Sequence, residues 1–372
     1  MNKSIHIVSF DVPYPANYGG AIDVYYRMLA LSKAGYDIHL HCFDYGRGRQ
    51  KKLEELVQEV YYYQRKSLWK ANASMSPMIV ASRKNPQLLA NLKQNNWPIL
   101  FEGQHCTAFL DHPDLSDRIK VVRLHNVEHA YYRSLAVATN KLWKKIFFQM
   151  EAKKLQKQEK TLSHASALLC INENDLAYYA AQWNNCYLSP ISLPLTAIEH
   201  NEKDNYVLYH GNLAVEENEN AVLWLLRNVV KEINCQLVIA GKKPSKQLRQ
   251  LIHQFENVAL IANPSDEELN KLLQCAKAHV LYSEQATGLK LKLLRALQNN
   301  APVFVNETMV VGTQLHALCK VFENASDLIS NINQCPKAPL NNNDFQIRIA
   351  ILTKLYAPSI IVKQLDELLF AQ

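Results

Sequence analysis

The chain has 372 residues, of which 48% are hydrophobic and 20% are charged. This composition excludes a disordered protein and predicts two domains of about 150–200 residues each. The formal net charge of +7 favours a phosphate-bearing ligand or an anionic membrane surface. A nucleic-acid partner is not expected, because the sequence lacks a concentrated basic stripe.

The eight cysteines are widely separated, and several lie inside apolar runs. They predict buried free thiols in a reducing compartment rather than disulfides or a zinc site. The first apolar stretch, from Ile5 to Phe10, is too short for a signal-peptide core, and no run approaches the roughly 18 apolar residues of a membrane span. We therefore expect a cytoplasmic protein.

The first half of the chain alternates between predicted strands and helices. An apolar run over Ile5–Phe10 precedes a loop rich in Pro and Gly, a helical pattern over Ile22–Leu31 and a strand over Asp37–Phe43, which together predict a βαβ unit. Further strands are predicted at Glu59–Tyr63, Ile99–Glu102, Lys120–Leu124, Ala167–Ile171 and Cys186–Leu188, with one long helix over Val127–Ser163. This alternation predicts a mostly parallel, doubly wound sheet.

The alternation restarts after a polar, proline-containing segment. The predicted organisation is a first domain over residues 1–190, a linker over 191–204, a second domain over 205–355 and a final segment over 356–372. In the second domain we predict strands at Tyr206–His210, Gln236–Ala240, Val258–Ile261, Ala278–Tyr282 and Pro302–Val305, and helices at Asn218–Val230, Ser245–Gln254, Ser265–Ala276, Gly288–Gln298 and within Asp327–Gln334. The sequence thus predicts two Rossmann-like halves in an α/β chain.

Glycines lie where two predicted helices begin. Gly19 and Gly20 stand just before the first helix, where exposed amides and the helix dipole can hold a phosphate; a plain tight turn is the alternative. Thr287 and Gly288 offer the same geometry in the second half. Lys290 and Lys292 follow in that helix's first turn and indicate either an anionic ligand or a solvated helix face.

Histidines directly follow two predicted strands of the first half. His105 and His125 are expected at the carboxyl edge of a parallel sheet, where ligands bind in such folds. His125 with Glu128 and His129 has a spacing that a metal would allow, but no fourth ligand is evident, so no metal is expected.

Several segments together resemble the two-domain GT-B glycosyltransferases, especially the large retaining family 4. The segments that carry the resemblance are Phe10–Pro15 with Gly19-Gly20, Leu124-His125-Asn126, Tyr209-His210-Gly211-Asn212-Leu213, Thr287–Leu294 and Asn299–Val305. The resemblance implies two Rossmann-like domains that face each other across a cleft, the first on the acceptor side and the second binding the nucleotide-sugar. It also implies a terminal helix that crosses back to the first domain.

The same resemblance implies roles for individual residues. Gly20 would lend its amide to the donor diphosphate, and His125 would lie near the transferred sugar as the catalytic residue. Nucleotide-sugar binding is further expected at Gly19, Gly211, Asn212, Thr287, Gly288, Lys290, Lys292 and Arg295. The family's paired glutamates, seven residues apart, correspond here to Thr287 and Arg295.

The function expected from these features is transfer of a sugar from a nucleotide-sugar donor to a glycan or lipid-linked acceptor, with retention and with no metal or other cofactor. The first alternative is a GT-B protein that binds a glycan or a partner without catalysis, because the paired glutamates are absent. The third interpretation is a sugar-nucleotide epimerase or a phosphorylase. It is less favoured, because the sequence lacks the pyridoxal-lysine motif and the acidic base pattern expected of these enzymes.

One predicted helix has a residue pattern that is compatible with membrane binding. Trp143, Ile146, Phe147 and Met150 follow a helical spacing and are flanked by lysines. This apolar stripe is expected either to pack on the first domain's sheet or to dock peripherally on a membrane.

Overall fold

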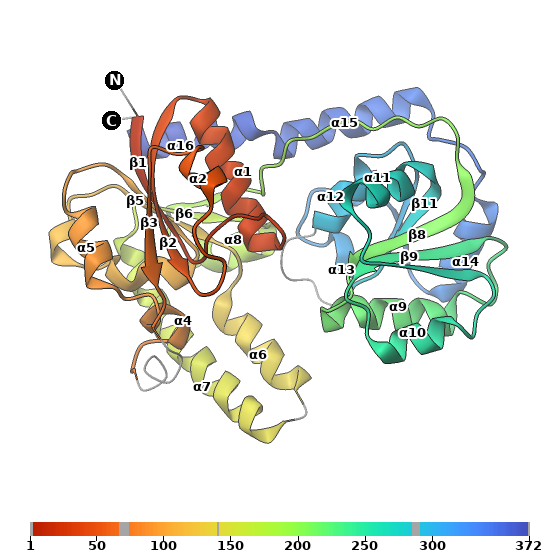
Figure 1. The fold of residues 1–372 in the computed structure, drawn as a ribbon, viewed down its shortest axis with the longest axis horizontal. Coiled ribbons are helices and arrows are strands. Elements are labelled where there is room, and N and C mark those ends of the chain that lie inside the picture. The colour runs from red at the N-terminus through yellow and green to blue at the C-terminus, as the bar shows by residue number, and fades with distance from the viewer. Residues whose placement is uncertain (1–2, 67–73, 140, 285–290, 371–372) are drawn as a thin grey trace. The chain divides into compact units, whose positions relative to one another are not determined.

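The computed structural model describes residues 3–66, 74–139, 141–284 and 291–370 (Figure 1). The chain divides into two compact units. The first contains residues up to Pro194 together with the segment from Leu355 onward, and the second runs from Leu195 to Lys354. The sequence had suggested a first domain that ends at residue 190 and a return segment that begins at residue 356.

The first unit is built on a seven-stranded sheet in the order β3-β2-β1-β4-β5-β6-β7, in which every pair is parallel. The strands are β1 (Lys3–Ser9), β2 (Tyr36–Asp44), β3 (Glu59–Gln64), β4 (Ile99–Glu102), β5 (Lys120–Leu124), β6 (Ala167–Cys170) and β7 (Cys186–Leu188). In the centre, Ile7 stands opposite Leu40 on one side and Leu100 on the other, and all three are fully buried. Apolar residues on both faces are typical of a parallel sheet that helices cover on both sides.

Helices and 3-10 turns connect these strands. They are α1 (Gly19–Lys33), α2 (Lys51–Glu54), α4 (Met78–Ala81), α5 (Pro86–Leu92), η1 (Gln104–Phe109), η2 (Pro113–Leu115), α6 (Glu128–Ala138), α7 (Leu142–Gln158), η3 (Glu159–His164), α8 (Glu173–Ala180) and α16 (Pro358–Phe370). α16 completes the core of this unit with Ile361, Leu365 and Leu369. Its Asp366 accepts hydrogen bonds from Lys3 Nζ at 2.6 Å and from Tyr36 Oη at 2.5 Å.

The second unit has a six-stranded parallel sheet in the order β10-β9-β8-β11-β12-β13. The strands are β8 (Asp204–Asn212), β9 (Gln236–Lys242), β10 (Val258–Ala262), β11 (Ala276–Leu281), β12 (Val303–Asn306) and β13 (Lys320–Phe322), and the helical segments are α9 (Glu216–Asn228), α10 (Lys246–Ile252), α11 (Asp266–Cys275), α12 (Leu291–Leu297), α13 (Glu307–Val310), η4 (His316–Leu318), α14 (Ala325–Gln334) and α15 (Asn342–Tyr356). Alternate residues of β8 enter two cores, Val207 and Tyr209 on one face and Leu208 on the other. The predicted doubly wound α/β architecture is confirmed for both units.

The structure corrects several predicted elements. The long helix expected over Val127–Ser163 is interrupted between α6 and α7, because Thr139 and Lys141 have extended backbone conformations, and its last residues form the 3-10 helix η3. β8 continues to Asn212, so Gly211 and Asn212 lie within the strand and not in the loop after it. β13, a strand of three residues, was not predicted.

Both sheets reverse their winding direction at one point. In the first unit the chain crosses from the β3-β2-β1 side to β4, and in the second from the β10-β9-β8 side to β11. Ligands of doubly wound folds bind outside the carboxyl ends of the strands at this switch point. A ligand site is therefore expected at the ends of β1 and β4 or at the ends of β8 and β11.

Within the described residues, the run Asn342–Phe370 is long and apolar enough, by length and composition, to cross a membrane. Several of its apolar residues are used in packing, however. Phe345 and Leu352 are buried in α15, and Ile361, Leu365 and Leu369 of α16 belong to the core of the first unit. Packing thus uses part of the apolar side chains of this run, whereas Ile347 and Ile360 are exposed.

Candidate functional site

The start of α1 offers unpaired backbone amides at the switch point of the first sheet. Gly19 and Gly20 lie in the first turn of α1, because the helix begins about one turn earlier than the sequence suggested. The first hydrogen bond of the helix runs from Ile22 N to Tyr18 O at 2.9 Å. Among the described residues, no side chain caps this end, and the first turn holds no acidic residue. Such a helix start suits an anion.

Gly20 is packed against an aromatic ring. A Cβ atom added to Gly20 would lie 2.6 Å from Cζ of Phe10, far inside van der Waals contact. The Phe10 ring in turn lies 5.4 Å, between ring centroids, from both His105 and His125. The close approach of the helix start to Phe10 therefore links the predicted phosphate loop to the two predicted histidines.

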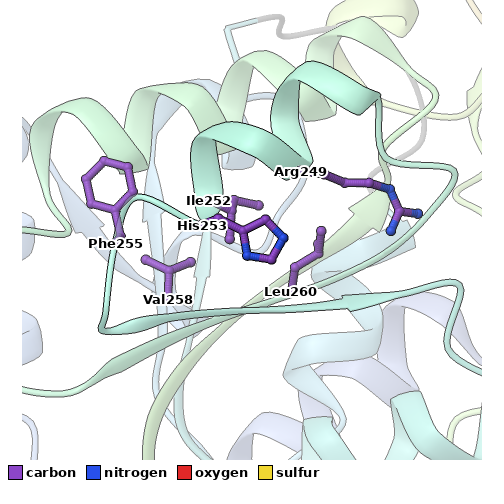
Figure 2. A pocket seen from close by; sticks show the side chains of 6 residues that line it. All are labelled: Arg249, Ile252, His253, Phe255, Val258 and Leu260. Atoms are coloured by element: carbon purple, nitrogen blue, oxygen red, sulfur yellow. The ribbon is translucent and has the colours of Figure 1, made fainter.

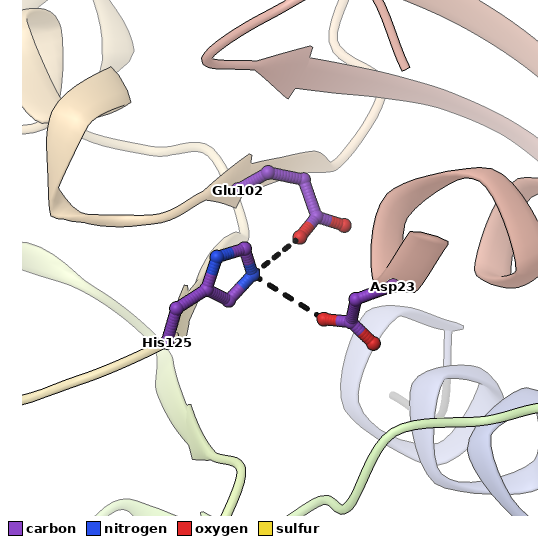
Figure 3. A group of neighbouring side chains, drawn as sticks. All are labelled: Asp23, Glu102 and His125. Carbon is purple, nitrogen blue, oxygen red and sulfur yellow. Dashed lines mark ion pairs between the residues drawn. The ribbon is translucent and has the colours of Figure 1, made fainter. Parts of the chain in front are cut away.

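His125 is held between two carboxylates (Figure 3). Its Nε2 lies 3.3 Å from Oδ2 of Asp23 on α1 and 3.5 Å from Oε2 of Glu102 at the end of β4. The side chain keeps 9% of its surface exposed, whereas both carboxylates are fully buried. Three elements that meet at the switch point thus fix the orientation of the imidazole.

Two buried arginines complete this charged network. Arg27 Nε lies 2.8 Å from Glu102, and Arg27 Nη2 lies 2.5 Å from Asp23. Arg123 contacts the Asp23 carboxylate through two nitrogens, at 2.6 and 3.1 Å, and also donates to the carbonyl oxygen of Ser189. Because unpaired buried charges are costly, these contacts make each member depend on the others.

The network shifts the pKa values of its members. Burial acts to raise the pKa of Asp23, but the charges of Arg123 and Arg27 outweigh it and hold this pKa well below its usual range. The pKa of Glu102 is also lowered, against burial, chiefly by Arg27. Burial acts to lower the pKa of His125. Hydrogen bonds and charges from Asp23 and Glu102 act in the opposite direction and outweigh burial, so the pKa of His125 is raised. The arrangement thus favours an oriented imidazolium.

The ligand atoms of Asp23, Glu102 and His125 lie within 4.8 Å of one another, which is close enough for a metal. Arg27 and Arg123 already neutralise the two carboxylates, so a cation would enter beside two guanidinium groups. The residues fit a fixed imidazolium better than a metal. The metal set suggested by sequence spacing is not formed among the described residues, because His129 Nδ1 instead pairs with Glu159 at 2.7 Å.

Glu128 and His105 lie beside this network. Burial raises the pKa of Glu128 to about 7, although the charge of His125 acts in the opposite direction. Oε1 of Glu128 lies 3.9 Å from Nδ1 of His105. Glu128 is therefore the carboxyl group of this site that changes protonation near neutral pH.

The second unit gathers polar side chains at the end of β8. Asn218, in the first turns of α9, donates from Nδ2 to the carbonyl oxygen of Asn212 at 3.0 Å and accepts from Lys292 Nζ at 2.8 Å. A Cβ atom added to Gly211 would lie 3.3 Å from Cγ of Asn218, so this packing is tight. Lys292 Nζ also lies 5.4 Å from the ring centroid of Tyr209. The structure thus brings Gly211, Asn212 and Lys292 together.

The remaining predicted residues of the second unit have different positions. The Arg295 guanidinium contacts α11, at 2.9 Å from Oδ1 of Asn270 and 3.9 Å from Asp266. Thr287, Gly288 and Lys290 lie outside the described residues.

Sequence reasoning missed most of the charged network around His125. The available signals were the spacing of Asp23 and Arg27, which are i and i+4 on one helix, and the position of Glu102 at the end of a strand. Arg123 lies inside a buried strand and gave no signal. These residues meet only through the packing of α1 on β4 and β5.

A separate pocket of about 270 Å³ lies between α10 and β10 (Figure 2). Its lining is Arg249, Ile252, His253, Phe255, Val258 and Leu260. None of these is a predicted site residue, and β10 is an edge strand that β9 and β8 separate from the switch point. This pocket is therefore separate from the candidate site.

Comparison with known proteins gives one family and a set of similar structures. Residues 204–334 match the family described as "Glycosyl transferases group 1". A Klebsiella pneumoniae protein described as "Uncharacterized 44.6 kDa protein in cps region" is 29% identical over 325 residues, which are 82% of this chain and 83% of that protein.

Two solved structures show the same fold over almost the entire chain. Anabaena Alr3699/HepE, in complex with UDP and glucose, has a TM-score of 0.65 at 10% identity and covers 100% of both chains. The lipopolysaccharide outer core galactosyltransferase WaaB, in its apo form, has a TM-score of 0.65 at 13% identity and covers 99% of both chains. The chain therefore has the GT-B fold, and its residues 204–334 match the model of the group 1 glycosyl transferases.

Proposed function

We propose that this protein transfers a sugar from a nucleotide-sugar donor to a glycan or lipid-linked acceptor, with retention, in the synthesis of a cell-surface polysaccharide. The observation that carries the proposal is the meeting of the uncapped start of α1 with the oriented His125 at the switch point of the first sheet. The UDP and glucose bound to HepE and the cps region that holds the Klebsiella relative support the choice of donor and pathway class.

The chemistry needs charge stabilisation more than a nucleophile. As the sugar leaves, negative charge grows on the diphosphate, and groups that meet this charge lower the barrier. The amides of Gly19 and Gly20 at the start of α1 can supply such contacts. The ammonium of Lys292, beside Asn218, is a group of suitable charge in the second unit and is expected to bind the nucleotide. A retaining front-face transfer requires no protein side chain to attack the sugar.

His125 is proposed to act on the transferred sugar. Its Nε2 is occupied by Asp23 and Glu102, so Nδ1 is the nitrogen that can donate to a sugar hydroxyl or to the leaving oxygen. Asp23 and Glu102 are positioning residues in this scheme, because they hold the ring and favour its protonated form. A hydrogen bond that strengthens in the transition state would appear in the rate rather than in donor affinity.

Calorimetric titration with UDP, GDP and ADP, followed by hydrolysis assays across a panel of nucleotide-sugars, tests this function. We expect one nucleotide to bind, and Lys292→Ala to weaken that binding about tenfold or more, since a charged hydrogen bond contributes roughly 1.5–3 kcal/mol. The matched control is Lys246→Ala, an exposed lysine on α10. Failure of all three nucleotides to bind at millimolar concentration would contradict the proposal.

The alternative function is binding without catalysis. It is favoured by one observation, namely that the family's paired glutamates correspond to Thr287 and Arg295, and the Arg295 side chain is engaged by Asn270 of α11. A protein that binds a nucleotide and glycan but neither hydrolyses nor transfers from any donor would support this alternative.

A further inference from the structure

The hairpin formed by α6 and α7 projects from the rest of the first unit (Figure 1). Its base is anchored, because Glu151 accepts a hydrogen bond from Met78 N at 2.6 Å and Lys154 donates to the carbonyl oxygen of Ser74 at 3.0 Å. Ala152 and Leu155 are buried at the same level. The base therefore holds the hairpin on the unit, and the other end carries the chain reversal between the two helices.

The tip of the hairpin exposes large apolar side chains. The exposed fractions are 82% for Val137, 72% for Leu142, 66% for Trp143 and 50% for Ile146, and Met150, nearer the base, is 55% exposed. The interpretation that the stripe of α7 packs on the sheet is therefore wrong. The two helices contact each other through a different face, on which Tyr132 meets Phe148 with ring centroids 5.9 Å apart.

The charge around this apolar tip has one sign. From His129 to Met150 the sequence contains no Asp or Glu, and it contains Arg133, Lys141, Lys144 and Lys145. The two acidic residues that flank this stretch, Glu128 and Glu151, are buried. Lys144 Nζ lies 5.6 Å from the ring centroid of Trp143, so cationic and aromatic groups are adjacent.

We propose that this hairpin tip, defined as Val137, Leu142, Trp143 and Ile146 with Lys141, Lys144 and Lys145, docks on an anionic lipid surface. Aromatic and aliphatic side chains enter the headgroup boundary of a bilayer, while lysines are attracted to anionic headgroups. A second copy of the chain is a poorer occupant, because a two-fold contact would bring the same lysines together. The inference goes beyond the proposed function, since docking requires no catalysis.

Vesicle co-sedimentation of the full chain tests the docking. We expect binding to vesicles of phosphatidylcholine with phosphatidylglycerol, and little binding to phosphatidylcholine alone or at high salt. Lys144→Gln with Lys145→Gln should lower the partition coefficient on the order of 20-fold, because each lysine near an anionic surface contributes about fivefold. The matched control is Lys51→Gln with Lys363→Gln, which removes two exposed lysines elsewhere in the same unit.

A second pair of variants tests the contribution of the apolar side chains of the hairpin tip to docking. Ile146→Ser should weaken vesicle binding, and Ile347→Ser, whose side chain is 51% exposed on α15, should leave it unchanged. Absence of binding to anionic vesicles at low salt would overturn the proposal, as would equal binding by the lysine variant and its control. Self-association that Ile146→Ser abolishes, without lipid binding, would identify a second copy as the occupant. Calorimetry with nucleotide on the same samples reports the proposed function separately.

Discussion

At the scale of single residues, the site depends on charges that are buried and mutually compensated. Asp23 contacts Arg27, Arg123 and His125, so its carboxylate is the centre of the network. Removing one partner of a buried ion pair leaves an uncompensated charge, which costs more than the pair itself contributes. The orientation of His125 is therefore a property of the network.

His125→Ala should lower turnover roughly 10- to 100-fold while changing nucleotide affinity little, because a hydrogen bond to a charged donor contributes about 1.5–3 kcal/mol and is made here mainly in the transition state. Steady-state kinetics and calorimetry on the same preparation measure the two effects. His164→Ala, at an exposed histidine of the same unit, is the control. An equal loss of nucleotide binding would show that the ring contacts the nucleotide instead of the sugar.

Gly20→Ala should destabilise the first unit by about 1–3 kcal/mol, because the new Cβ would lie 2.6 Å from Phe10. A bulkier residue such as Val at this position should therefore disturb folding as well as block an amide. Chemical denaturation of Gly20→Ala, Phe10→Leu and the double variant measures the coupling. Strictly additive losses would mean that Phe10 does not set the requirement for glycine.

At the scale of elements, β1, β2 and β3 are joined by a chain of polar side chains. His6 Nε2 donates to Asn95 Oδ1 at 2.8 Å, which leaves Nδ1 to accept from His41 Nε2 at 2.9 Å. His41 Nδ1 then accepts from the Tyr63 hydroxyl at 2.8 Å, and that oxygen accepts from Asn91. With both imidazoles neutral, every one of these contacts pairs a donor with an acceptor.

This series of hydrogen-bonded side chains predicts that the folded protein loses stability in acid. Burial, with a smaller contribution from Arg118, lowers the pKa of His6 to about 4 from an ordinary value near 6.5. At His6 the unfolded chain therefore binds a proton more readily than the folded protein. The contribution of neutral His6 to the free energy of unfolding is fully present above pH 6.5 and is lost as the pH falls toward 4. The loss is on the order of 3 kcal/mol.

Urea unfolding across this pH window measures the effect. His6→Gln should show a smaller loss of stability on acidification than the parent protein, and His164→Gln should show the same loss. If His6→Gln kept the full pH dependence, His6 would not be one of the groups responsible.

At the scale of the whole molecule, the two units have separate cores. The first core includes Leu365 of α16, which the chain supplies only after completing the second unit, and the second core includes Leu328 of α14. Both side chains are fully buried. Each unit can therefore be destabilised through its own core.

Leu365→Ala should cost about 2–5 kcal/mol and Leu328→Ala a similar amount, because each deletes buried methyl groups and leaves a cavity. Hydrogen exchange should show faster opening of β1 and β2 in the first variant and of β8 and β9 in the second. Equal loss of protection in both units from either variant would show that they unfold as one body.

Local pattern was enough to predict the alternating elements and the parallel sheets, because a period of two or 3.6 residues is visible in a short window. It also predicted that Gly19, Gly20 and His125 lie at one sheet edge, since the carboxyl ends of parallel strands share an edge. Only the tertiary structure decided that His125 meets Asp23 and Glu102, which are distant in sequence and come together when α1 packs against β4 and β5. It also decided that the tip of α7 stays exposed, because a helical period defines an apolar face but not what covers it.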